Sequence, residues 1–437
     1  MNRDLTLPPA RLARSTRTAV QAFRLVDLVA QAHEPTDTQL NALSSAYFAT
    51  SEFLLEQPEF ANDLVEIHAH GSRQLGTIVR PRDGSREGFD IDLITRLHPS
   101  ALGTYGGPAG PALLLSRLEA ALRKYASAHG LSVQRHDRCV TLEYAGGMCA
   151  DIAPVIDDPS VLGAYGASHA LIPDRELHRM ESTNPRGYAK YFNEVGDISP
   201  RFLTGWTIAM DSLSEASIAP LSNPQEVFAK ILCRLVQLVK LHRNAKFAPA
   251  AKGADVAPTS IFLTTLVAEA YRVEAPLPHA SPLELLLDIV ERMPLHFQRI
   301  PRSGGQEEWY LADPAVPRGN LAEGMNSLGH QKAFFAWHEL LITDIGRILN
   351  AIDGNHGMDA LLKAVKNAFG DRGSAAVATA QLAQQQTLRA AGKTAVFTTA
   401  AGSTMSAAST VTAASASSVS APTARTLSSR AHTFFGR

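Results

Sequence analysis

Apolar and polar residues alternate over several short stretches in the first part of the chain. The segments 63–70 and 89–97 show this pattern, which predicts strands because every second side chain of a strand points to the same face. Two further apolar runs, 133–144 and 148–156, are separated by Ala145-Gly146-Gly147. A glycine pair between two such runs is typical of a hairpin.

Other stretches repeat their apolar residues every three to four positions, as amphipathic helices do. Up to about residue 200 they are interspersed with the strands and with a glycine-rich loop at 103–110, and beyond it the pattern is helical. We expect helices over 10–32, from Pro35-Thr36-Asp37 to about 54, over 111–129, from Asn223-Pro224 to about 243, from Pro258-Thr259-Ser260 to about 271, and over 282–292, 331–353 and 358–369. A mixed unit followed by helices predicts an α+β fold.

The same pattern divides the chain into four expected regions. These are N-terminal helices that bridge two lobes (1–60), a core with a mixed sheet (61–200), a helical lobe (201–373) and a low-complexity tail (374–437). The tail consists mostly of Ala, Ser and Thr, with a weak helical pattern near 376–391. Because it has too few apolar side chains to offset its ordering entropy, we expect it to be disordered.

Composition narrows the class of protein. The chain has 437 residues, 45% of them hydrophobic and 19% charged, as in globular proteins, and no stretch approaches the apolar length of a membrane span. Its three cysteines, Cys139, Cys149 and Cys233, are too few for a disulfide framework, so we expect a cytoplasmic protein. A zinc site at His136, Cys139 and Cys149 is less expected than buried thiols because no C-x-x-C pair accompanies them.

Three acids carry the candidate chemistry. Asp90 and Asp92 are two positions apart on a predicted strand, and Asp151 lies in the apolar segment 148–156. Pairing of these two strands would place the three carboxylates side by side, where they repel one another unless cations bind between them. An acid pair alone is often a solvent-facing feature of an edge strand. Followed by a third acid on a later strand, it indicates a site for two Mg²⁺ ions, with Mn²⁺ as an alternative.

A Gly71-Ser72 turn precedes the acid pair. Its backbone N–H groups and hydroxyl can hold phosphate, as such turns do in many phosphate sites. A phosphate cradle followed by a metal-binding acid pair is the arrangement of a nucleotidyltransferase, in which a hydroxyl attacks an α-phosphorus in line. His68 and His70 share a strand face near this turn, and we expect them to pack or support the site rather than bind metal.

With these motifs, the chain resembles the bacterial cGAS/DncV-like nucleotidyltransferases (CD-NTases) of the polymerase-β-like superfamily. The resemblance covers about residues 35–271, with looser helical similarity to about 369. The matching stretches are 70–77, 89–94, 151–155, 171–175, 183–188, 238–243 and 258–266. The resemblance implies a bilobal enzyme whose nucleotidyltransferase core packs against a helical lobe, with the active site between them.

The resemblance also implies roles for individual residues. Gly71 and Ser72 would hold a triphosphate, and Asp151 would help to deprotonate the attacking 3′-hydroxyl. Lys240 and Ser260 match the second triphosphate clamp of the family. Their positions agree with this, because a lysine near a helix end can extend to a cleft edge and a helix N-terminus attracts anions. Further candidates are Arg73 and Gln74 for contact with phosphate or base, and Tyr165, Tyr188 and Trp206 for base stacking.

The implied activity joins nucleoside triphosphates, ATP or GTP first, into a cyclic di- or trinucleotide. In the family such a second messenger activates a separate effector protein in antiphage defence (CBASS). Two alternatives stay open: nucleotide transfer to a small molecule, protein or linear oligonucleotide, and an inactive nucleotide-binding scaffold. The C-terminal tail could engage an operon-encoded regulator or ligation enzyme, although the chain ends in Arg437 rather than a bare glycine. A net charge of −1 argues against nucleic acid as a partner.

Overall fold

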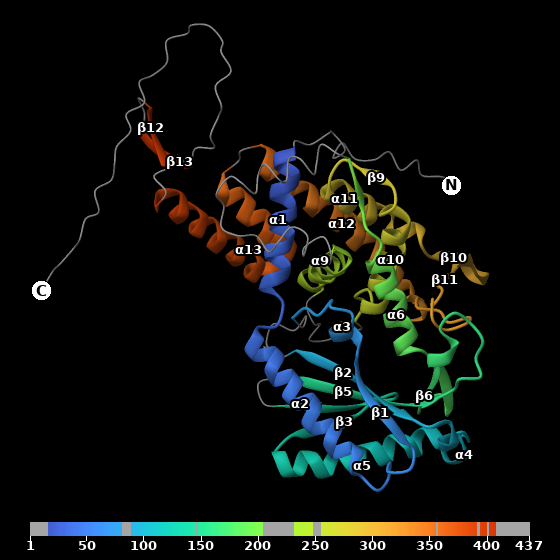
Figure 1. Cartoon of the computed structure of the whole chain (residues 1–437). Coiled ribbons are helices and arrows are strands. Elements are labelled where there is room, and N and C mark those ends of the chain that lie inside the picture. Colours follow the sequence, from blue (N-terminus) through green and yellow to red (C-terminus); the bar gives the residue numbers. More distant parts are fainter. Residues whose placement is uncertain are drawn as a thin grey trace, which may run out of the picture.

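The fold consists of a sheet lobe and a helical lobe, each with its own hydrophobic core (Figure 1). The computed structural model describes residues 16–80, 89–144, 147–203, 231–247, 255–354, 357–390, 394–399 and 402–407. Within them, no helix has the length and apolar character needed to cross a membrane. The expected α+β architecture is confirmed.

A seven-stranded mixed sheet forms the centre of the sheet lobe. Its main path is β1-β2-β5-β4-β3, and β6 pairs with β5 and β7. The strands are β1 (Leu64–His70), β2 (Asp90–Leu97), β3 (Ser132–Arg135), β4 (Val140–Glu143), β5 (Cys149–Asp157), β6 (Ala170–Asp174) and β7 (Arg179–Thr183). Strands β2 and β5 are parallel, and the other pairs are antiparallel. The expected hairpin is present as β4–β5, but the run 133–144 divides into β3 and β4.

Two helices, α2 (Asp37–Leu55) and α5 (Gly110–His129), contribute to the core of the sheet lobe. Helix α2 begins where expected, because Thr36 forms a capping box with Gln39. Helix α5 has a fully buried leucine stripe, and Gly130 ends it with a positive φ of 66°. Part of the loop expected over 103–110 is instead helical, since residues 102–105 form α4 (Leu102–Tyr105).

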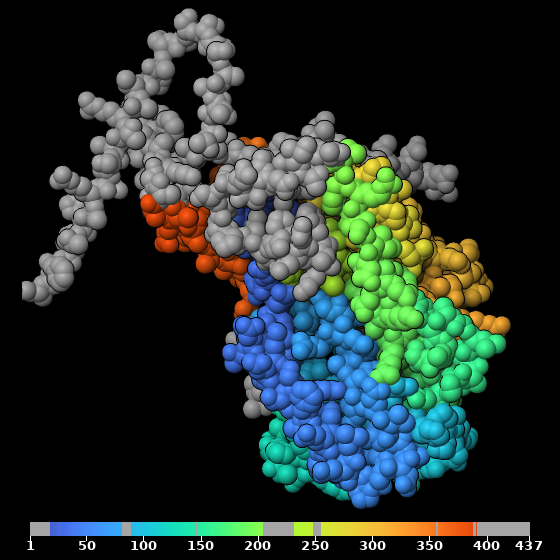
Figure 2. Space-filling model, viewed as in Figure 1, coloured from blue at the N-terminus to red at the C-terminus, as the bar shows by residue number. Residues whose placement is uncertain are grey.

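The helical lobe gathers helices from both ends of the described chain. They are α1 (Thr16–Ala32), α6 (Pro185–Gly196), α9 (Ile231–Lys246), α10 (Ser260–Glu274), α11 (Pro282–Arg292), α12 (Leu328–Asp353) and α13 (Met358–Ala390). Helix α1 packs in this lobe and α2 in the sheet lobe, so the N-terminal segment connects the two. Helix α6 also packs here through Tyr188 and Phe192. Both the N-terminal segment and the segment around α6 extend from one lobe to the other on the face in Figure 2.

Short strands interrupt a region that was expected to be wholly helical. They are β8 (Arg201–Phe202) with β9 (Pro278–His279), and the hairpin β10 (Gln298–Pro301) with β11 (Glu307–Tyr310). Single turns of 3₁₀ helix lie at 99–101, 166–168, 293–295, 303–305 and 323–325. The β10–β11 strands are too short for a readable alternation, and their pairing is supported by an ion pair between Arg299 and Glu307.

The expectation of disorder from Ser374 onward is wrong for residues 374–390, which continue α13, whereas the helical pattern near 376–391 is confirmed up to Ala390. The helix bends at Gly370, whose φ is 80°, and its later part packs on α1 with Val377 buried. Alanine is the best helix former, so packing on one side is enough to order this segment. Strands β12 (Thr394–Thr399) and β13 (Gly402–Ala407) follow. The rest of the expected tail and the helix start at Asn223-Pro224 lie outside the described residues.

Candidate active site

The three candidate acids lie on neighbouring parallel strands. In the register of the sheet, Asp92 of β2 is paired with Asp151 of β5, and Asp90 lies two positions before Asp92 on the same face. The row continues outward to His70 at the end of β1 and to Thr141 of β4. Four adjacent strands therefore present His70, Asp92, Asp151 and Thr141 side by side.

The Gly71-Ser72 turn lies in close contact with this row of side chains. Gly71 follows β1 with a φ of 59° and begins the single-turn helix α3 (Gly71–Gln74). A Cβ atom at this position would lie 1.8 Å from Oδ2 of Asp92. Only glycine permits both the left-handed backbone and this approach. The turn therefore brings Ser72 and the backbone next to the carboxylates.

Burial and mutual repulsion shape the electrostatics of the acids. Burial, followed by the nearby charges of Asp151 and Asp90, raises the pKa of Asp92 from its ordinary value of 3.8 to about 6, against an opposing effect of Lys240. Thr141 donates a hydrogen bond to Oδ1 of Asp151 and so turns this carboxylate toward β4. A cluster of three carboxylates, with the pKa of Asp92 raised, fits a divalent cation, which would relieve their repulsion.

Lys240 approaches the acids from the helical lobe. Its side chain is buried, and Nζ donates a hydrogen bond of 3.0 Å to the carbonyl oxygen of Thr77. Burial and the neighbouring Arg243 lower the pKa of Lys240 to about 8, while Asp92 acts in the opposite direction. The helix was expected to end at about residue 243, near Lys240, but α9 continues to Lys246. The lysine reaches the site from a buried helix face rather than from a helix terminus.

Ser260 occupies the first position of α10, as expected for an anion site at a helix N-terminus. Arg243 holds it in place, with Nη2 donating 2.9 Å to Oγ of Ser260 and Nη1 donating 2.6 Å to the carbonyl oxygen of Pro258. Sequence reasoning missed Arg243. Its spacing of three residues from Lys240 was the available signal, since this spacing places both cations on one helix face.

A buried acid anchors the helix that carries Lys240. Asp344 of α12 accepts hydrogen bonds from Lys246 at 2.7 Å and from Arg347 at 2.7 Å, and it lies 3.3 Å from Nε2 of His242. Burial alone would raise the pKa of Asp344, but these partners outweigh it and lower the pKa strongly. The network joins α9 to α12 and so fixes the face of α9 that carries Lys240 relative to the rest of the lobe.

A pocket of about 520 Å³ lies where the sheet lobe meets α9 and α10. Its volume is in the range of small-molecule sites. Among the predicted site residues, the structure brings together Gly71, Ser72, Asp90, Asp92, Asp151, Lys240 and Ser260 along its wall. Additional lining residues include His70, Arg80, Arg243, Asn244 and Thr264. The acids and the candidate phosphate ligands thus face one shared space.

Some candidates lie elsewhere. Arg73 and Gln74 are absent from the pocket wall, and Gln74 is exposed. Tyr188 is buried in the helical lobe and hydrogen-bonded to Thr265 at 2.7 Å, so it cannot stack on a base. Tyr165 contacts Glu194 outside the pocket, and Trp206 lies outside the described residues. His70 does line the pocket, and burial lowers its pKa to about 4, so its imidazole is neutral near pH 7.

Comparison with known proteins shows which family the sheet lobe is similar to. Residues 24–195 match the family model of the Second Messenger Oligonucleotide or Dinucleotide Synthetase domain. A c-di-GMP synthase of Roseivirga ehrenbergii is 27% identical over 296 residues, which cover 68% of this chain and 70% of the relative. The resemblance to CD-NTases seen in the sequence is confirmed.

Solved structures extend the similarity in fold beyond the synthetase domain. The CD-NTase CdnG of Bradyrhizobium diazoefficiens, solved in complex with GTP, superposes with a TM-score of 0.56 at 19% identity, over 82% of this chain and 98% of that chain. CdnC of E. coli MS115-1, solved with ATP, gives a TM-score of 0.53 at 14% identity, over 80% and 98%. Both lobes of the chain therefore follow the CD-NTase fold.

Proposed function

We propose that the protein is a nucleotidyltransferase that joins nucleoside triphosphates into a cyclic oligonucleotide. The observation that carries this proposal is a single pocket in which Asp90, Asp92 and Asp151 face the Gly71-Ser72 turn. The match of residues 24–195 to the model of a family of second-messenger synthetases supports the same activity. GTP is the first substrate to test, because the curated relative is a c-di-GMP synthase and CdnG was solved with GTP. ATP is the second, from the structure of CdnC.

The phosphate ligands would come from both lobes. The backbone of Gly71 and the hydroxyl of Ser72 would bind the triphosphate from the sheet side. The ammonium of Lys240 and the hydroxyl of Ser260 would bind it from the helical side, with Arg243 orienting Ser260. Because these groups are held by α3, α9 and α10, they would position the α-phosphorus before reaction rather than rearrange during it.

Asp90, Asp92 and Asp151 would hold Mg²⁺ or a similar divalent ion. When bound, such ions neutralise charge on the phosphate oxygens and favour loss of the hydroxyl proton of the nucleophile. Asp151 would accept this proton from a 3′-hydroxyl, and the hydrogen bond from Thr141 would orient its carboxylate. The new bond joins that 3′-oxygen to the α-phosphorus, and the bond to pyrophosphate breaks. A second transfer within the linear product would close the ring.

We also propose that the product acts as a second messenger for a separate effector protein in antiphage defence. This follows from the CD-NTase resemblance and from the second-messenger description of the matched family. The pocket itself has no role in that step beyond determining which cyclic product is released.

Incubation of the purified protein with the four nucleoside triphosphates and Mg²⁺ tests the synthesis. We expect a phosphatase-resistant product, identified by mass spectrometry as a cyclic di- or trinucleotide. The double variant Asp90→Ala/Asp92→Ala should make none, while Asp371→Ala, at an exposed position of α13, should behave as wild type. Product from the double variant would refute the site. Turnover only after addition of a small molecule, protein or oligonucleotide would replace cyclisation by transfer to that acceptor.

A further inference from the structure

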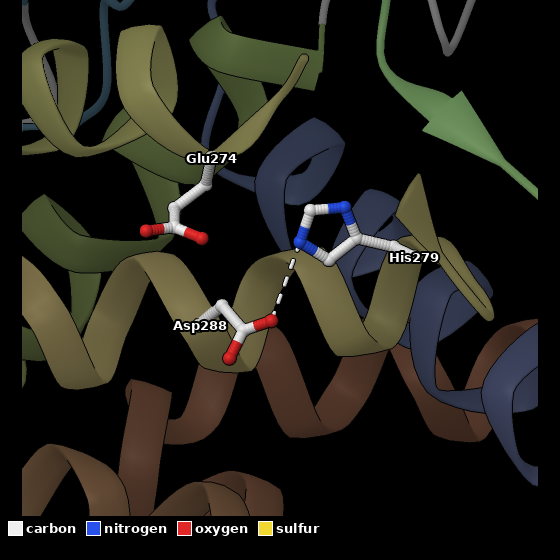
Figure 3. A group of neighbouring side chains, drawn as sticks. All are labelled: Glu274, His279 and Asp288. Carbon is white, nitrogen blue, oxygen red and sulfur yellow. Dashed lines mark ion pairs between the residues drawn. The ribbon is translucent and has the colours of Figure 1, made fainter. Parts of the chain in front are cut away.

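Three buried side chains meet at the end of α10 that is remote from the pocket. Glu274 is the last residue of α10, His279 lies in β9, and Asp288 lies in α11. Their exposed fractions are only 1%, 3% and 8%. One potential ligand atom from each lies within 4.8 Å of the others. Figure 3 shows the three side chains directed toward one another across the space between these elements.

The hydrogen bonding of His279 determines what its second nitrogen can do. Nδ1 lies 2.8 Å from the carbonyl oxygen of Leu277, which can only accept, so Nδ1 carries a proton. Nε2 then faces Oδ2 of Asp288 at 3.3 Å. When the imidazole of His279 is neutral, its Nε2 and the Oδ2 of Asp288 are both hydrogen-bond acceptors. They can face each other stably only if a proton or a metal ion lies between them.

The geometry points to a metal: we propose that Glu274, His279 and Asp288 form a binding site for a divalent transition-metal ion of the Zn²⁺ class. Tetrahedral Zn²⁺ with bonds of about 2.0–2.2 Å keeps its ligand atoms roughly 3.4 Å apart, close to the 3.3 Å between His279 and Asp288. The imidazole favours Zn²⁺ over Mg²⁺ or Ca²⁺, which prefer oxygen ligands alone. Water would complete the coordination.

Neighbouring groups orient the three candidate ligands through hydrogen bonds, as the residues around metal ligands commonly do. Leu277 fixes the tautomer of His279 with Nε2 toward the site. Arg292 donates 2.6 Å to Oε1 of Glu274 and orients this carboxylate. Within this group, two carboxylates and one guanidinium leave one negative charge, which either a proton on Nε2 of His279 or a bound cation would offset. A divalent ion would compensate this charge in a buried place.

The role that follows is structural rather than catalytic. The ion would tie the end of α10 to β9 and α11, while the other end of α10 carries Ser260 in the pocket. Because the ligands come from three elements that are brought together only by folding, binding would stabilise the folded state by mass action. The proposal is independent of the proposed function, since none of its ligands lines the pocket.

Metal binding to the full chain tests the site. The Asp90→Ala/Asp92→Ala background removes two candidate acids of the pocket, so that any remaining ion can be assigned. After EDTA treatment and dialysis, Zn²⁺ is added and the bound metal is counted by mass spectrometry. Co²⁺ in its place reports tetrahedral coordination by strong visible absorption. We expect about one ion per chain and a rise in Tm with Zn²⁺.

The matched control is His169→Gln. His169 is equally buried, at 2%, and its Nδ1 lies 3.7 Å from Oδ2 of Asp158. His169→Gln should keep the ion, whereas His279→Gln should lose it together with the Zn²⁺-dependent rise in Tm. If His279→Gln fails to fold, Asp288→Asn provides the same comparison. Absence of bound Zn²⁺, or equal binding by the His279 and His169 variants, would overturn the proposal and leave a proton between His279 and Asp288.

Discussion

Replacement of Asp92 by asparagine should stabilise the protein while abolishing synthesis. Asp92 is partly buried beside two other acids, and its pKa is raised from 3.8 to about 6. At about 1.4 kcal/mol per pKa unit, its ionisation costs about 3 kcal/mol of folding free energy at neutral pH. Loss of its attraction to Lys240 makes this an upper bound. For 437 residues, the gain at pH 8 corresponds to roughly 3 °C in Tm.

The sign of the pH dependence is a stricter test than the size of the effect. A carboxyl group whose folded pKa lies above its unfolded pKa favours folding when protonated. This contribution is present below pH 3.8 and is lost as pH rises through about 6. The stability difference between Asp92→Asn and wild type should therefore be small near pH 4, increase up to about pH 6 and then level off.

Urea unfolding in EDTA at pH 4.5, 6 and 8 measures this difference. Asp90→Asn is the comparison, because Asp90 is exposed on the same strand and contributes less than burial and Asp151 to the raised pKa of Asp92, so its stability difference should be smaller than that of Asp92→Asn at pH 6 and 8. Mg²⁺ should stabilise wild type at pH 8 more than Asp92→Asn. A variant less stable than wild type at pH 8, or a difference that is independent of pH, would refute the view that Asp92 is held ionised at the expense of stability.

Three further predictions concern other parts of the site and the junction of the lobes. Gly71→Ala should reduce kcat/KM at least about 100-fold, because the new Cβ would collide with Asp92 and the φ of 59° disfavours alanine. Wild-type kinetics for this variant would contradict the prediction. Lys240 should bind triphosphate as an ammonium, so KM should rise as pH increases through about 8, whereas Lys240→Arg should give a flat KM profile over this range. Asn184→Ala should lower stability by about 2–4 kcal/mol in urea unfolding with little change in KM, because its buried side chain caps α6 at Gly187 and bonds the carbonyl oxygens of Tyr165 and Ala315. An unchanged unfolding midpoint would show that these contacts do not hold the loop at Ala315 to α6.

The local pattern of apolar and polar residues was sufficient to predict the strands that carry the three acids. The alternation around Asp90 and Asp92 predicted β2, and the apolar run around Asp151 predicted β5, because the side-chain period of a strand is visible within a few residues. Helix α11 has the predicted ends, with Ser281 capping its first turn. These features depend on neighbouring residues alone.

Contacts between distant residues explain where prediction failed. The helix beyond Ser374 is ordered by packing on α1, a segment at the other end of the chain. Arg73 and Gln74 follow Ser72 in sequence, but they are absent from the pocket wall. Arg243 contributes because α10 starts beside it, and local pattern does not show that contact.

The sequence by itself determined the chemical groups and their local placement: two acids on one strand face, a third acid on a later strand and a Gly-Ser turn before them. Only the tertiary structure decided that Asp92 pairs with Asp151, that Gly71 touches Asp92, and that Lys240 and Ser260 complete the pocket from another lobe. The physical reason is that residue type and backbone period are local properties. Register, burial and the pKa values that follow from them arise when distant segments exclude water together.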